Sequence, residues 1–179
     1  MNYSQYDDIA DKYDELFLDE DSLSENTEVG EMLLPLVGSV LDIGCGTGLL
    51  TEIVNVSPKD YMGIDPSKKM LDVFKRKHPA FNYVVCSCYD GRVVDCGRFD
   101  NVVSLFGSAS YLSNGALREL SRYYGHLFLM FYKEGYHPVT YEKCKVDFQH
   151  NARSRKYLES LFGKEKVKEF NNYIIVDSR

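Results

Sequence analysis

The chain has 179 residues, of which 44% are hydrophobic, and its net charge is −6. This length predicts a single domain, residues 1–179, that is large enough to bury a core. The acidic balance argues against a nucleic-acid partner, because phosphate binding depends on clustered Lys and Arg. Five cysteines, an odd number, with no export signal and no apolar run of the ~20 residues that span a membrane, predict a reduced, cytoplasmic protein.

The first 36 residues predict two helices. Apolar and aromatic residues recur at helical spacing between residues 3 and 17, and again between residues 22 and 36, where Ser24 is a candidate N-cap and Pro35 lies near the end. Acidic residues crowd this region, whereas basic residues gather at 68–77 and 153–156. The simplest interpretation of these charged runs is that they are solvated helix faces.

The stretch from Val40 to Gly48 (VLDIGCGTG) is the most informative part of the sequence. An apolar run ends in three alternate glycines, Gly44, Gly46 and Gly48, and a helical pattern begins at Leu49. Glycine tolerates left-handed backbone angles and lets a ligand approach the main chain. The N-terminus of the next helix offers unpaired N–H groups. The pattern therefore predicts a strand, a ligand-binding loop and a helix.

Three types of glycine loop compete for this stretch. A dinucleotide fingerprint needs Gly or Ala at position 49, where this chain has Leu49. A phosphate-binding P-loop needs a Gly-Lys-Ser/Thr sequence, which is missing here. The remaining pattern, D-x-G-x-G-x-G from Asp42 to Gly48, resembles motif I of the class I S-adenosylmethionine-dependent methyltransferases, in which Cys45 is also usual.

This resemblance implies a three-layer, Rossmann-like α/β fold with a seven-stranded, mostly parallel sheet and an antiparallel last strand. It also implies S-adenosyl-L-methionine as the methyl donor and S-adenosyl-L-homocysteine as the product. The pattern around Tyr6 and Tyr13 is similar to the opening helix of small-molecule methyltransferases, so residues 1–36 are expected to cover the cofactor crevice. The residues expected to bind the cofactor are Tyr13, Asp42, Gly44, Cys45, Gly46, Gly48, Asp65, Pro66, Ser87, Cys88 and Leu105.

Asp65 ends a second strand-like run, which begins at Tyr61, about 20 residues after the first glycine. At this spacing a carboxylate can accept hydrogen bonds from two ribose hydroxyls, and the resemblance implies this role for Asp65. Pro66 and Ser67 predict a turn and the N-cap of a helix that stops before Pro79.

The third and fourth predicted strands, 81–86 and 99–106, lead to other parts of the crevice. The family carries an acid after its third strand that contacts the adenine amino group; Ser87 matches that position best, and Asp90 is a second candidate. Cys86 and Cys88 are interpreted as small strand residues near the pocket, and no metal site is expected. The carboxyl end of the fourth strand, at Gly107, should flank the methyl group.

The remaining chain predicts a helix capped by Ser113 and ended by Gly125, a strand over 126–132, a helix over 151–162 and a hairpin of strands 167–170 and 173–176. Segment 133–150 is a candidate substrate loop because of its length. His137 or His150 is a candidate general base, and Tyr132 or Tyr136 is a candidate for orienting the acceptor.

Together these features predict methyl transfer to a nitrogen or oxygen atom of a small-molecule acceptor. The Pro-Pro tetrapeptide of enzymes that methylate amino groups of nucleic acids is missing after the fourth strand, where Leu105 to Ser108 stand. One alternative is a non-catalytic cofactor-binding or partner subunit of the same fold, because a cofactor motif says nothing about turnover. A nicotinamide-dependent reductase is another, disfavoured by Leu49. The acceptor and the oligomeric state stay open.

Overall fold

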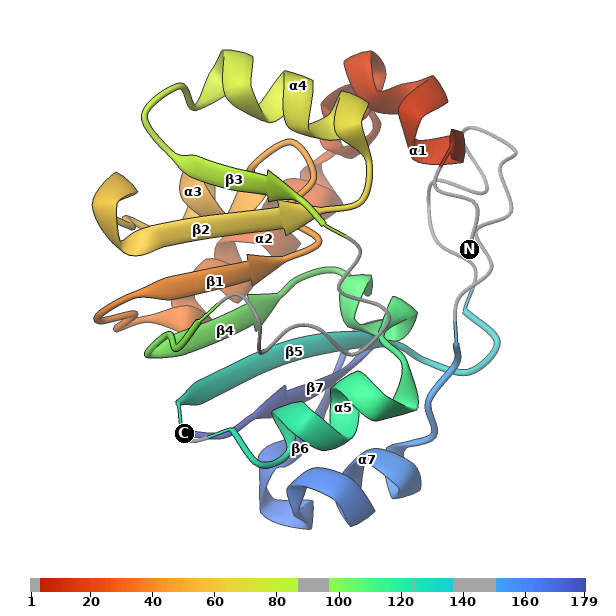
Figure 1. Ribbon diagram of the computed structural model, residues 1–179. Helices are drawn as coiled ribbons and strands as arrows, with labels where there is room; N and C mark the ends of the chain where they lie inside the picture. Colours follow the sequence, from red (N-terminus) through yellow and green to blue (C-terminus); the bar gives the residue numbers. More distant parts are fainter. Residues whose placement is uncertain (1–3, 87–96, 124, 137–150) are drawn as a thin grey trace.

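The computed structural model describes residues 4–86, 97–123, 125–136 and 151–179. Its centre is a seven-stranded sheet in the order β3-β2-β1-β4-β5-β7-β6 (Figure 1). Strands β1 to β5 pair in parallel, and β7 runs antiparallel to both β5 and β6. The predicted fold and its antiparallel last strand are therefore confirmed. The strands are β1 (Val40–Ile43), β2 (Tyr61–Asp65), β3 (Asn82–Val85), β4 (Asn101–Ser104), β5 (His126–Tyr132), β6 (Val167–Phe170) and β7 (Tyr173–Asp177).

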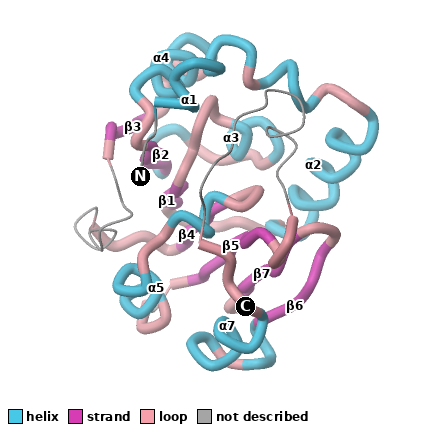
Figure 2. The backbone as a smooth tube through the Cα atoms, turned by 90° about the vertical axis from the view of Figure 1, so that its right-hand side faces the viewer, coloured by secondary structure: helices cyan, strands magenta, loops and turns pink. Residues whose placement is uncertain are grey.

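Helices cover both faces of the sheet and make three layers. Helices α2 (Glu20–Leu33) and α3 (Leu49–Ile53) lie on one face, and α5 (Asn114–Leu120) and α7 (Arg155–Phe162) on the other (Figures 1 and 2). Helix α4 (Lys68–Lys77) connects β2 to β3 and packs against α1 (Ser4–Ile9). Among the described residues, no helix is long and apolar enough to cross a membrane.

The central strands are buried and mostly hydrophobic because both of their faces are covered. Every residue of β1 and β4 is buried, as are all residues of β5 after His126. A parallel sheet between two helical layers has no solvent-facing side, so its strands do not alternate between apolar and polar residues. This core holds the carboxyl ends of β1, β2 and β4 together at one edge of the sheet.

Side-chain caps define several helices at the predicted residues. The hydroxyl oxygen of Ser67 accepts a hydrogen bond from the Met70 N–H at 3.1 Å, and Ser113 caps α5 in the same way. Helix α4 ends at Lys77, before Pro79, as expected. Helix α7 is shorter than predicted because Ser154 caps it, and α5 ends at Leu120 rather than near Gly125.

The N-terminal helices differ most from the prediction. Segment 3–17 is not one helix: α1 is followed by two 3₁₀ turns, Ala10–Lys12 and Asp14–Phe17. Helix α2 is capped by Asp19, whose carboxylate accepts a hydrogen bond from the Ser22 N–H at 3.0 Å, and not by Ser24. Contacts with the body of the protein, described below, override local helix propensity in this segment.

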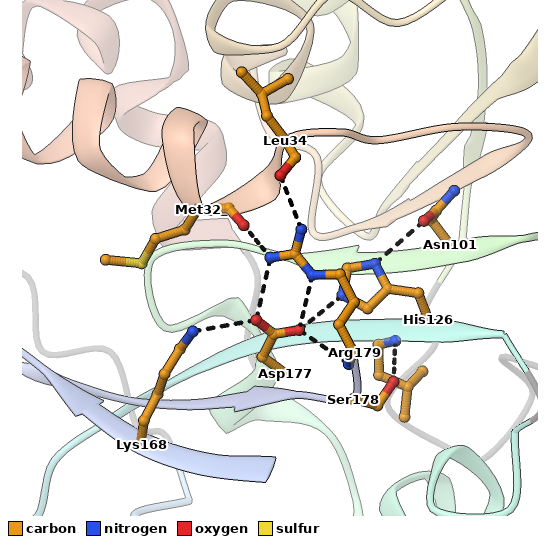
Figure 3. Close-up of polar contacts among 9 residues, drawn as sticks. Met32, Leu34, Asn101, His126, Lys168, Asp177, Ser178 and Arg179 are labelled. Carbon is orange, nitrogen blue, oxygen red and sulfur yellow. Dashed lines mark hydrogen bonds and ion pairs between the residues drawn. The ribbon is translucent and has the colours of Figure 1, made fainter.

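The end of the chain is tied down at the amino-terminal edge of the parallel strands. The Asp177 carboxylate lies 2.9 Å from His126 Nε2 at the start of β5 and also contacts Lys168 and Arg179 (Figure 3). The Arg179 guanidinium donates in turn to the backbone carbonyl of Leu34 at 3.1 Å. This cluster joins β5, β6 and β7 to the segment that follows α2.

Candidate active site

The glycine loop folds back onto the end of β2. The Gly44 and Cys45 N–H groups both donate to the Ile64 carbonyl, at 2.8 and 3.1 Å. Gly44, Gly46 and Gly48 have φ values of 73°, 53° and 107°, the left-handed region that favours glycine. A Cβ on Gly44 would lie 2.7 Å from the Ser108 Cβ. The loop therefore needs glycine both for its backbone angles and for its close approach to the segment after β4.

Asp65 lies beside this loop, as its spacing predicts. It is 8% exposed, its Oδ2 accepts a hydrogen bond from the Gly46 N–H at 3.0 Å, and its Oδ1 accepts one from the Ser67 N–H at 2.8 Å. Burial raises the pKa of this carboxyl from 3.8 to about 6, although the two N–H donors oppose the shift. Each carboxylate oxygen keeps a second lone pair for a ligand donor.

A crevice of about 50 Å³ opens between the glycine loop and the N-terminal segment. Five of the residues expected to bind the cofactor line it: Tyr13, Gly44, Gly46, Asp65 and Pro66. Tyr6 and Tyr132, which also stand out in the sequence, line the crevice as well. The remaining lining residues were not predicted; they are Met70, Phe106, Ser108 and Tyr111. Phe106 and Ser108 both follow β4, the strand whose carboxyl end is expected to flank the methyl group.

Four other residues that were expected to bind the cofactor are buried and lie in or next to the glycine loop and at the end of β4. Asp42, Cys45, Gly48 and Leu105 are buried. Asp42 accepts a hydrogen bond from the Tyr61 hydroxyl at 2.8 Å, and burial raises the pKa of its carboxyl to about 7. None of these four residues lines the crevice, and their role in cofactor binding stays a prediction. Ser87, Cys88 and the alternative Asp90 fall outside the described residues, so the adenine side of the crevice stays a prediction.

The covering segment, residues 4–17, is held over the crevice by its acidic side chains. Asp7 accepts a hydrogen bond from the Ser67 hydroxyl at 2.6 Å, and Asp11 pairs with Arg76 on α4 at 2.6 Å. Asp14 accepts from the Thr47 hydroxyl and pairs with Lys77. The charged runs of the covering segment and α4 are thus partly paired with each other, which corrects the interpretation that they are only solvated faces.

Two tyrosines of the covering segment close the crevice. The Tyr6 hydroxyl lies 3.1 Å from that of Tyr111, and the Tyr6 and Tyr13 ring centroids are 6.2 Å apart. Both rings line the crevice opposite the glycine loop. The N-terminal residues thus form one wall of the crevice, and their role as a cover for the cofactor stays a prediction.

A larger groove of about 940 Å³ adjoins the crevice. It runs between the start of α2, the segment after β4, the end of β5 and the turn between β6 and β7. Tyr13, Phe106 and Tyr132 line both hollows, so a ligand in one lies next to a ligand in the other. Tyr132, a candidate for orienting an acceptor, is at this boundary. His137 and His150 fall outside the described residues, as does most of segment 133–150.

Comparison with known proteins shows similarity to methyltransferases. Residues 40–126 match a family model described as a methyltransferase domain. The 18S rRNA (guanine-N(7))-methyltransferase bud23 of Schizosaccharomyces pombe is 29% identical in an alignment of 146 positions that covers 73% of this chain and 54% of that protein. The chain spans about half the length of the curated relatives it matches.

Two solved structures share the fold across most of the chain. A possible histamine N-methyltransferase from Thermotoga maritima has a TM-score of 0.65 at 18% identity and covers 99% of both chains. A putative methyltransferase solved with the Trm112 methyltransferase activator of Haloferax volcanii has a TM-score of 0.62 at 15% identity, covering 90% of this chain and 76% of that one. By its motif, its sheet order and these matches, the chain is similar to the class I S-adenosylmethionine-dependent methyltransferases and shares their fold.

Proposed function

We propose that the protein binds S-adenosyl-L-methionine in the crevice and transfers its methyl group to a nitrogen or oxygen atom of a small molecule held in the groove. The observation that carries this proposal is that the crevice formed by the glycine loop and Asp65 meets the groove at Tyr132. A donor site and an acceptor site that share a wall satisfy the main requirement of methyl transfer, which is positioning.

The residues of the crevice fit an adenosyl cofactor. When bound, the cofactor supplies a methyl group that is already activated on a sulfonium. Asp65 has acceptor capacity left for two ribose hydroxyls, and Gly46 presents main chain without a Cβ to the crevice. Tyr6 and Tyr13 line the crevice on the side of the covering segment and would shield a bound cofactor from water. Tyr132 would orient the acceptor, and His137 or His150 would take a proton from an acceptor that needs deprotonation.

The acidic groove argues for a small-molecule acceptor over a nucleic acid. Glu25, Glu28 and Asp19 are among its lining residues, and the described part of its lining contains no Lys or Arg. Carboxylates repel phosphate groups, on which nucleic-acid affinity largely depends. An RNA acceptor like that named for the yeast relative would need a basic surface elsewhere.

A second candidate is a cofactor-binding subunit that needs a protein partner. The Haloferax methyltransferase that shares this fold was solved with an activator protein, which motivates this alternative. The purified chain alone distinguishes the two: turnover without added protein supports an independent enzyme. Cofactor binding with turnover only after a partner is added supports the second candidate.

Isothermal titration with S-adenosyl-L-homocysteine and with NAD(P) tests the cofactor assignment. We expect the adenosyl ligand alone to bind, and Asp65→Ala to weaken it by roughly 100-fold, because the loss removes two charge-assisted hydrogen bonds. Asp60→Ala, just before the other end of β2, is the matched control and should leave the affinity unchanged. Binding of NAD(P) alone, or equal affinity in Asp65→Ala, would contradict the proposal.

A further inference from the structure

Four aromatic rings gather at the end of the groove that adjoins the crevice. The Tyr132 ring centroid lies 5.6 Å from that of Tyr136 and 5.8 Å from that of Tyr173, and Phe106 meets Tyr173 edge-on at 5.8 Å. All four residues line the groove. They come from the segment after β4, from β5 and the residues after it, and from β7, so the sheet itself positions this aromatic box. Ring faces carry negative potential that attracts cations.

The same groove is negatively charged. Its acidic lining residues are Asp14, Asp19, Asp21, Glu25, Glu28 and Glu52. Lys77 lies within 2.7 Å of both Asp14 and Glu52 and so compensates part of this charge. Within the described chain, Asp21, Glu25 and Glu28 have no Lys, Arg or His within ion-pairing distance. The groove therefore holds excess negative charge beside the aromatic box.

Glu25 connects the charge to the rings. It is half-buried on α2, and one of its carboxylate oxygens accepts a hydrogen bond from Asn171 Nδ2 at 2.9 Å. Burial raises the pKa of Glu25, and the nearby Glu28 raises it further. Asn171, the donor to Glu25, stands two residues before Tyr173, and all three residues line the groove, so the carboxylate and this ring face the same hollow. A cation at this position would offset the cost of ionising Glu25.

We infer that the acceptor is a cationic amine whose ammonium group binds between Glu25 and the box of Phe106, Tyr132, Tyr136 and Tyr173. This inference rests on the proposed function, because the box shares Phe106 and Tyr132 with the cofactor crevice. Aromatic rings and a carboxylate together recognise ammonium groups. Neither feature favours a phosphate, a carboxylate or a neutral alcohol.

Methylation of such an amine requires that its ammonium group first lose a proton. The ammonium loses one proton to solvent at the open end of the groove and becomes a neutral amine. Its lone pair forms the new N–C bond while the S–C bond of the sulfonium breaks, and the bonding electrons go to sulfur. The positive charge thus moves from sulfur to nitrogen, and the product is an N-methylated ammonium that the same acidic groove accommodates.

Choline and its neutral isostere 3,3-dimethylbutan-1-ol test the inference directly. Their affinities are measured by NMR titration of the full chain, with and without S-adenosyl-L-homocysteine. We expect choline to bind at least about tenfold more tightly than the alcohol. Glu25→Gln should weaken choline roughly three- to tenfold without changing the affinity for the alcohol. Gln keeps an oxygen for the Asn171 hydrogen bond, so the variant removes only the charge.

Glu31→Gln is the matched control, because Glu31 is an exposed acid of α2 outside the groove lining. It should leave both affinities unchanged. Equal affinity for choline and the alcohol, no choline binding, or a Glu25→Gln variant that binds choline as tightly as the native chain would overturn the inference. Failure of S-adenosyl-L-homocysteine to bind would instead contradict the proposed function. The titration of choline and the alcohol without S-adenosyl-L-homocysteine would still decide whether the groove prefers a cation.

Discussion

The carboxylates at the two ends of the parallel strands have pKa values that are shifted in opposite directions. At the carboxyl-terminal edge, burial raises the pKa of Asp42 to about 7 and that of Asp65 to about 6. At the amino-terminal edge, hydrogen bonds from Ser39 lower the pKa of Asp100. Despite its burial, Asp177 also has a pKa well below its usual range, because His126, Arg179 and Lys168 donate to it (Figure 3). The acids at the amino-terminal edge stabilise the fold through their hydrogen bonds. The buried acids at the carboxyl-terminal edge reduce the stability of the fold but keep acceptor oxygens for a ligand.

This difference follows from the number of donors that the fold supplies. Asp177 contacts the cationic side chains of Lys168 and Arg179 and the His126 ring, whereas Asp65 accepts from two neutral backbone N–H groups. Charge-assisted hydrogen bonds are roughly twice as strong as neutral ones. The donors that Asp65 lacks are those that a ribose would provide, so an incompletely satisfied acid is what a cofactor site should contain.

Asp177→Ala should have the largest effect on stability. The substitution removes the hydrogen bonds to His126, Lys168 and Arg179, and we expect the free energy of unfolding to fall by about 2–4 kcal/mol. Urea denaturation at pH 7.5 measures this loss. The affinity for S-adenosyl-L-homocysteine should not change, because Asp177 lies at the opposite edge from the crevice. A loss below about 0.5 kcal/mol would show that the two edges do not differ as proposed.

Asp42→Asn should have the reverse effect on stability. The folded protein holds a proton on Asp42 more tightly than the unfolded chain does, because burial raises its pKa from 3.8 to about 7. The free energy of unfolding therefore decreases as the pH rises from about 4 to about 7. Asparagine removes this dependence and can still accept from the Tyr61 hydroxyl. We expect the variant to be about 1–3 kcal/mol more stable than the native chain at pH 8.

Denaturation between pH 2 and pH 8 tests the raised pKa values of Asp42 and Asp65 against the lowered pKa of Asp177. The depressed pKa of Asp177 contributes stability above about pH 4 that is lost as the pH falls further. The native chain should therefore be most stable at about pH 4 to 5 and less stable at both lower and higher pH. A native chain whose stability rises steadily up to pH 8, or an Asp42→Asn variant with an unchanged pH profile, would contradict this account.

Cofactor affinity should depend on the ionisation of Asp65. A protonated carboxyl accepts ribose hydroxyls poorly, and the pKa of Asp65 is about 6. We therefore expect S-adenosyl-L-homocysteine to bind about tenfold more weakly at pH 5 than at pH 7.5. Asp65→Asn should bind weakly at both pH values. An affinity of the native chain that is constant between pH 5 and pH 7.5 would show that Asp65 does not carry the ribose contact.

The sequence predicted the strands and the cofactor loop well because both depend on local patterns. The buried runs of β1, β2 and β5 have the predicted bounds or differ by one residue at most, and Ser67 and Ser113 cap the predicted helices. The three glycines and the spacing to Asp65 form a motif that short-range geometry nearly determines. These are the parts of the chain where propensity and tertiary contacts agree.

The aromatic box and the acidic groove could not be predicted in this way. Phe106, Tyr132 and Tyr173 lie on different segments and meet only because β5 pairs with both β4 and β7. The broken covering segment depends on contacts between Asp14 and residues more than 30 positions away. Such long-range pairings leave no periodic signal, and a run of acids has the same sequence pattern whether it is solvated or paired.

The smallest effects concern the contacts that hold the covering segment. Asp11 and Arg76 have side chains that are 82% and 62% exposed, so Asp11→Asn should change stability by less than about 0.5 kcal/mol and leave cofactor binding unaltered. Asp14 contacts Thr47 next to the glycine loop and pairs with the half-buried Lys77. Asp14→Asn should release the segment and speed dissociation of S-adenosyl-L-homocysteine roughly three- to tenfold. Stopped-flow kinetics compares the two variants, and equal dissociation rates would show that the acids of the segment do not hold it over the crevice.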